Sequence, residues 1–101
     1  MTFITQVYEQ LRTANIVSSG EDFSVRFLKR SPKYYSAIKA QGRDVRIELL
    51  VELRSNLSAT REQLEQVVDM NLIGARYKKW AEIERGISEK ISNLTMQFDS
   101  S

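Results

Sequence analysis

The chain has 101 residues, of which 42% are apolar and 28% are charged, and its formal net charge is +2. This length suits one domain with a modest core, and the composition is that of a folded protein. Cysteine and histidine are both absent. Their absence excludes disulfides, thiolate metal sites and histidine-dependent triads, so we expect a non-enzyme with no metal, no cofactor and no catalytic residues.

No targeting or membrane signal is visible in the sequence. There is no uncharged apolar run of about 18 residues, the length that a membrane span needs. The first residues also lack the basic and apolar segments of a secretory signal. We therefore expect a cytoplasmic protein without a membrane partner, and no small-molecule substrate is indicated.

Basic residues are concentrated in one stretch of the chain. Between Phe23 and Arg43 there are six Lys and Arg residues and no acid, whereas the other nine basic residues are mixed with all thirteen acidic ones. An acid-free basic stretch is typical of a surface that faces phosphates. The alternative is a solvated surface that has few acids by chance.

Two helices are predicted in the first thirty residues. Apolar residues at three- and four-residue steps predict a helix from about Thr2 to Asn15. Serines at 18 and 19, followed by acids at 21 and 22, form a capping-box pattern. This pattern predicts a second helix from there to about Lys29.

A third helix is predicted to begin at Pro32. Serine is a favoured N-cap and proline is tolerated at the first helical position, so Ser31 and Pro32 both end the second helix and start the third. Tyr35 and Ile38 would face inward. The helix is expected to end near Gly42, because glycine suits the left-handed conformation beyond a helix end.

A fourth helix is predicted after Asp44, which we expect to be its N-cap. Its broadly apolar face would form the floor of an N-terminal core. The residues of that face are Ile47, Leu49, Leu50, Leu53 and Leu57. The sequence thus predicts an all-α fold in which residues 1–57 form a compact four-helix module.

Residues 58–101 carry a second apolar stripe. An unbroken helix over 60–98 would be about 58 Å long, more than the module could cover. Gly74 and Gly86 disfavour a helix interior, so a break near 71–74 and a helical hairpin are the alternative to one long helix. We expect a dimerisation or coiled-coil element that contacts a second copy through Leu72, Trp80, Ile83, Ile87, Ile91, Leu94 and Phe98.

Small and apolar residues between 19 and 42 are spaced as in two short helices around a tight turn. They are Phe23, Ser24, Phe27, Ser31, Tyr35, Ile38 and Gly42. Residues 3–57 thereby resemble the helix-turn-helix module of the phage-repressor and Cro-like superfamily. The turn at 28–30 departs from that pattern, because it is about one residue longer and lacks the usual glycine.

The resemblance implies that double-stranded DNA is the partner. It places the helix from Pro32 in the major groove, with Lys33, Tyr34, Ser36 and Ala37 toward base edges. The alternative for Tyr34 is packing against the fourth helix. Further residues at the ends of the two motif helices would meet phosphates, namely Ser19, Lys29, Arg30, Lys39 and Arg43.

The leading hypothesis is a sequence-specific transcription regulator of prokaryotic or phage type that binds DNA as a homodimer. A single head of this size buries too little DNA surface for strong specificity, which favours pairing through the C-terminal helix. The alternative is a helical protein-interaction module, such as an adaptor or an antitoxin-like partner. A third hypothesis is an architectural DNA binder with little sequence preference.

Overall fold

The computed structural model describes residues 2–67 and 74–99, with the side chains of 2–66 and 78–96. Within these ranges the chain contains helices and no strand, which confirms the predicted all-α class. The helices are α1 (Phe3–Thr13), α2 (Gly20–Arg26), α3 (Tyr34–Ala40), α4 (Ile47–Val67) and α5 (Gly74–Asp99). None of the helices over the described residues has the length and apolarity that crossing a membrane requires.

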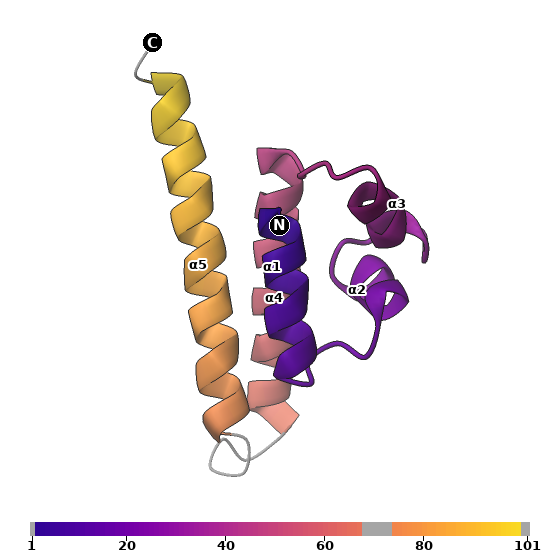
Figure 1. Cartoon of the computed structure of the whole chain (residues 1–101). Coiled ribbons are helices and arrows are strands. Elements are labelled where there is room, and N and C mark those ends of the chain that lie inside the picture. The colour runs from indigo at the N-terminus through magenta and orange to yellow at the C-terminus, as the bar shows by residue number, and fades with distance from the viewer. Residues whose placement is uncertain (1, 68–73, 100–101) are drawn as a thin grey trace.

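Two long helices form the frame of the molecule. Helices α4 and α5 run side by side in opposite directions, and α1 packs against α5 (Figure 1). Helices α2 and α3 pack against each other as a separate pair to one side of this frame (Figure 1). The predicted break at 71–74 falls mainly outside the described residues. The antiparallel packing nevertheless confirms the helical hairpin and excludes one unbroken helix.

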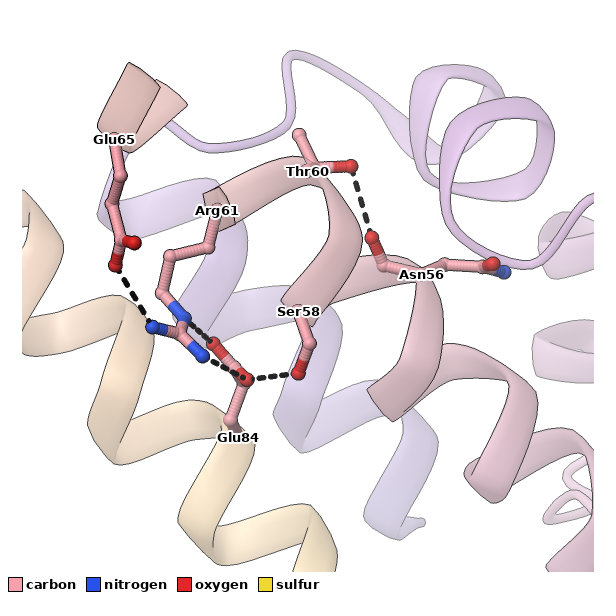
Figure 2. Close-up of polar contacts among 6 residues, drawn as sticks. All are labelled: Asn56, Ser58, Thr60, Arg61, Glu65 and Glu84. Carbon is pink, nitrogen blue, oxygen red and sulfur yellow. Dashed lines mark hydrogen bonds and ion pairs between the residues drawn. The ribbon is translucent and has the colours of Figure 1, made fainter. Parts of the chain in front are cut away.

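A polar cluster joins the two helices of the hairpin. The Arg61 guanidinium donates to Glu84 Oε2 at 2.6 Å and to Glu65 Oε1 at 3.1 Å, and Ser58 donates to the same Glu84 carboxylate (Figure 2). Both Ser58 and Arg61 lie beyond Leu57, where the sequence predicted the module to end. Helix α4 continues through that position to Val67.

One apolar core links the N-terminal helices to the hairpin. The ring of Phe27, at the end of α2, meets the Trp80 ring edge to face, with 6.2 Å between centroids. Trp80, Ile83 and Ile87 are 3%, 2% and 0% exposed. Burial of each such side chain stabilises the fold by about 1.5–3 kcal/mol.

Three residues of the predicted dimer interface lie instead in the chain's own core. The chain itself covers Trp80, Ile83 and Ile87, so they are not available to a second copy. Among the predicted interface residues whose side chains the structure describes, Ile91 and Leu94 are half-buried. Leu72 lies outside the described residues, as does the side chain of Phe98. The prediction erred because α4 folds back along α5 and supplies the cover that was expected from a partner.

Local caps define the ends of α1 and α2. At the start of α1, Thr2 Oγ1 accepts from the Thr5 amide at 3.3 Å. Ser19 Oγ accepts from the Asp22 amide at 3.1 Å, and Asp22 accepts from the Ser18 amide at 2.8 Å. The predicted capping box is therefore confirmed, although α2 ends at Arg26, three residues earlier than expected.

Helix α3 begins at Tyr34, two residues later than predicted, and no side chain caps it. The Tyr34 amide donates to the Ser31 carbonyl at 3.0 Å, and Lys33 has φ −95° and ψ 4°. These values and the proline at the second position are those of a type I turn, which uses the same Ser-Pro pair without starting a helix. At the other end, Gly42 has φ +67° and Arg43 donates to the Ile38 carbonyl, as a glycine-terminated helix requires.

Asp44 does not cap α4. Its carboxylate accepts from the amides of Phe3 at 2.8 Å and Ile4 at 3.2 Å, and from Val45 at 3.0 Å. It therefore satisfies the free amides at the start of α1, forty residues earlier in the chain. Helix α4 begins only at Ile47, and its apolar face packs inward as predicted, with Leu49, Leu50, Leu53 and Leu57 buried.

Candidate nucleic-acid interface

Ser24 fixes α3 relative to α2. Its side chain is fully buried, and its hydroxyl donates to the Gly20 carbonyl at 2.8 Å while accepting from the Tyr35 amide at 3.0 Å. A Cβ at Gly20 would lie 3.1 Å from Tyr35 Cδ2, so the two helices approach closely at this point. One small polar side chain thus sets both the spacing and the register of the pair.

An aromatic cluster holds the inner side of α3. The Tyr35 ring lies 4.6 Å from the Tyr8 ring and 5.4 Å from the Phe23 ring, measured between centroids. Burial raises the pKa of Tyr35, which therefore stays neutral. Ile38 is buried beside it in the same core, so both inward positions predicted from the sequence are confirmed.

The outward side of α3 follows from these two anchors. Three residues predicted to face outward, Lys33, Ser36 and Ala37, are exposed. Ala40 and Gln41 are also exposed, one helical turn further along. These two residues were not predicted, although steps of three and four residues from Ala37 lead to them. We call this set, Lys33, Ser36, Ala37, Ala40 and Gln41, the reading face.

The environment of Tyr34 agrees with the alternative of packing and not with the predicted DNA contact. It is half-buried and packs against the core. The Arg30 guanidinium lies 5.9 Å from the centroid of its ring. Tyr34 therefore belongs to the support of α3 and not to the reading face.

The turn between α2 and α3 is held by polar side chains. Arg30 donates to the carbonyls of Leu28 and Lys29, both at 3.3 Å, and pairs with Glu52 of α4 at 3.3 Å. Asn56 of α4 donates to the Phe27 carbonyl at 2.7 Å. Arg30, predicted as a phosphate contact, is thus engaged in positioning the turn. The roles of Glu52 and Asn56 were not predicted, because both depend on contacts over more than twenty residues.

Lys29 explains how the turn forms without the usual glycine. Its φ is +54°, in the left-handed region that glycine adopts most readily. Its side chain is exposed. The lysine therefore accepts backbone strain at this position and presents its charge to solvent.

Four exposed cations lie on or beside the reading face. Lys29, Lys33, Lys39 and Arg43 are all exposed, and none has an ion pair among the described residues. Arg26 and Arg30, by contrast, are paired with Asp22 and Glu52. Lys29, Lys39 and Arg43 lie near the ends of α3 and stay predicted phosphate contacts, whereas Lys33 stays a predicted base contact.

The predicted phosphate site at Ser19 is opposed by its surroundings. The Ser19 hydroxyl already accepts from the Asp22 amide, and the carboxylates of Glu21 and Asp22 lie in the same turn. Burial alone would raise the pKa of Asp22, but hydrogen bonds from Ser18 and the charge of Arg26 outweigh it, and the pKa lies below its ordinary value of 3.8. A carboxylate that stays ionised repels phosphate.

Residues 2–67 and 74–99 contain no group of three or more acids that could hold a metal ion. Residues 4–98 match a protein family described as a family of unknown function, DUF6626. The chain belongs to DUF6626. No curated protein and no solved structure matches this member of DUF6626 significantly. The description of the family names no activity.

Proposed function

We propose that this member of DUF6626 binds double-stranded DNA and reads the major groove with α3. One observation carries the proposal: a helix anchored by buried Tyr35 and Ile38 presents small and basic side chains outward, between unpaired cations. A helix fits the major groove best when its outward side chains are small. Lysines and arginines at its ends supply affinity through phosphates.

The reading face offers distinct contacts to base edges. Lys33 can donate to guanine acceptors, and Gln41 can form paired hydrogen bonds with adenine. Ala37 and Ala40 can approach a thymine methyl group, and Ser36 can donate or accept. Lys29, Lys39 and Arg43 are assigned to phosphates.

The proposal extends to a homodimer, because one head of this size buries too little DNA surface for a long site. Trp80, Ile83 and Ile87 are excluded from its interface by burial. The half-buried end of the stripe, Ile91 and Leu94, remains for a second copy. The expected role is a cytoplasmic transcription regulator of prokaryotic or phage type that recognises an inverted repeat.

The first test measures binding to a labelled random-sequence duplex by fluorescence anisotropy at several salt concentrations. Log affinity should fall steeply with log salt, and Lys39→Ala with Arg43→Ala should reduce that slope by about two, close to one per lost phosphate contact. The control, Lys78→Ala with Arg85→Ala, removes the same charge from exposed positions of α5 and should leave the slope unchanged.

Two outcomes would redirect the proposal. Absence of binding at about 50 mM salt would contradict it, since non-specific phosphate contacts are strongest at low salt. Binding without enrichment of any motif from a random-sequence library would favour an architectural binder. Enrichment of a motif that is relaxed by Gln41→Ala would establish base recognition by the reading face.

The protein-interaction alternative has lost its main support. It relied on the C-terminal stripe to hold another protein, and three stripe residues, Trp80, Ile83 and Ile87, lie in the chain's own core. A Leu94→Glu variant, examined for self-association and for DNA binding, tests whether this end of α5 contacts a second copy or another protein. Loss of self-association with retained binding to random DNA fits a homodimer interface at this end of α5.

A further inference from the structure

A hollow of about 500 Å³ lies between α3 and the start of α4. Its wall includes Tyr34 and Ile38 of α3, and Leu49 of α4. None of the residues of the reading face lines it. Its volume falls within the range of small-molecule sites, about 300–1,000 Å³. The hollow is therefore a concave surface next to α3, separate from the outward helix face proposed to meet base edges.

Apolar residues form part of the wall of the hollow. Ile38 and Leu49 line it and are each 5% exposed, so their side chains are held rigidly by the core. Tyr34 and Val45 are half-buried at its sides. Apolar surface of this kind gains free energy when a hydrocarbon or an aromatic ring covers it.

The rim of the hollow carries basic and acidic side chains. Arg43 and Arg46 line it, and neither has an ion pair among the described residues. The carboxylate of Asp44 is occupied by three backbone amides. Glu48 also lines the hollow, as does Arg30, which is paired with Glu52. Arg43 and Arg46 are therefore the lining arginines that are left for an anion.

We propose that this hollow binds a small monocarboxylate that carries an aromatic or branched apolar group. Arg43 and Arg46 bind the carboxylate, a group that guanidinium matches in shape and charge. The apolar group packs against Tyr34 and Val45, which are half-buried. A free phosphate or a DNA phosphodiester would satisfy the arginines but leave Tyr34 and Val45 without apolar cover, so the hollow fits an amphipathic anion better.

A regulatory consequence rests on the proposed function. Arg43 is assigned both to a DNA phosphate and to the carboxylate, and it cannot serve both fully. The anion would therefore lower the affinity for DNA, and DNA would lower the affinity for the anion by the same factor. This makes the hollow a candidate effector site for the DNA-binding protein.

The test uses the full chain without DNA and follows its backbone amide signals by NMR during titration with phenylacetate. Two control compounds are tested at matched ionic strength. Phenylacetamide provides the aromatic group without the charge, and inorganic phosphate provides an anion without the aromatic group. Phenylacetate should give saturating shifts of the Val45 and Leu49 amides, and neither control compound should saturate at the same concentrations.

Variants locate the site. Arg43→Gln with Arg46→Gln should weaken phenylacetate binding by about tenfold or more, because two charge-assisted contacts are lost. Glu48→Gln should strengthen it, and this variant keeps the test informative if the arginine variant folds poorly. Lys78→Gln with Arg85→Gln removes the same charge from α5 and should leave the affinity unchanged.

Three outcomes would overturn the site: no saturation by phenylacetate, equal binding of phenylacetamide, or equal binding of phosphate. Because no DNA is present, such a failure leaves the DNA proposal untouched. Phenylacetate binding to a chain that binds no duplex would keep the site and remove its regulatory role. If both bind, phenylacetate should weaken duplex affinity in the wild type and have no effect in the Arg43→Gln, Arg46→Gln variant.

Discussion

The α2–α3 pair and the α4–α5 hairpin are stabilised in different ways. The pair consists of two seven-residue helices, too short to be stable alone, and it depends on single contacts such as those of Ser24 and Arg30. The hairpin consists of helices of 21 and 26 residues held by a continuous apolar stripe. The hairpin therefore provides most of the stability, and the pair provides a precisely positioned surface.

The largest expected effect is in the hairpin. Ile87 is fully buried at the centre of the stripe, so Ile87→Ala should lower the free energy of unfolding by about 2–5 kcal/mol. Urea denaturation followed by circular dichroism measures this loss. Because one core joins the hairpin to α1 and α2, the transition should remain single. Separate unfolding of α2 and α3 would show that the two regions are less coupled than the shared core implies.

A smaller loss of stability and a larger loss of function are expected at Ser24. Ser24→Ala leaves the buried Tyr35 amide without its acceptor and should cost about 1–3 kcal/mol. It should also weaken DNA binding, because α3 is no longer fixed to α2. Ser55→Ala, at an exposed site of α4, is the control and should change stability by less than about 0.5 kcal/mol. Unchanged DNA affinity in a folded Ser24→Ala variant would contradict the positioning role.

Lys29 offers a gain instead of a loss. Lys29→Gly removes the strain of a left-handed lysine and should raise the free energy of unfolding by about 0.5–1 kcal/mol, after the greater unfolded-state freedom of glycine is counted. Lys29→Ala keeps the strain and should show no such gain. Both variants should lower the salt slope of DNA binding by about one, so in Lys29→Gly stability rises while DNA binding weakens. Thermal melts measure the change in stability, and fluorescence anisotropy measures the salt slope of DNA binding.

The smallest expected effect is the pH dependence at the start of α2. Because the pKa of Asp22 is lower in the folded chain than its ordinary value of 3.8, ionised Asp22 stabilises the fold above that value. This stability is lost as the pH falls through the folded pKa. Asp22→Asn should therefore be less stable than the wild type near neutral pH and approach it in acid. A difference that stays constant between pH 7 and acid would show that the charge is not involved.

Local signals in the sequence were sufficient for much of the fold. The roles of Ser19 at the start of α2 and of Gly42 at the end of α3 were predicted correctly, because each acts within one helical turn. The start of α3 was wrong because a Ser-Pro pair also suits a type I turn, and only the backbone of Lys33 distinguishes the two. Sequence spacing alone could not make this distinction.

Contacts over long sequence distances account for the other errors. Asp44 was assigned to the nearest following helix, whereas its partners are at the start of α1. The stripe at Trp80 to Ile87 was assigned to a second copy, because the pattern records that a side chain is buried and not what buries it. On α3, the inward residues were correct, and the outward set was incomplete at Ala40 and Gln41.

The contact of Asp44 with α1 links the two ends of the N-terminal half. The loop that carries Asp44 follows directly on the C-terminal end of α3, so fraying of the first turn of α1 would also release the support of α3. The amides of Phe3, Ile4 and Arg43 should then exchange their hydrogens in a single opening event, as one cooperative unit. Motion at the first residues of the chain would in this way reach the helix proposed to contact DNA.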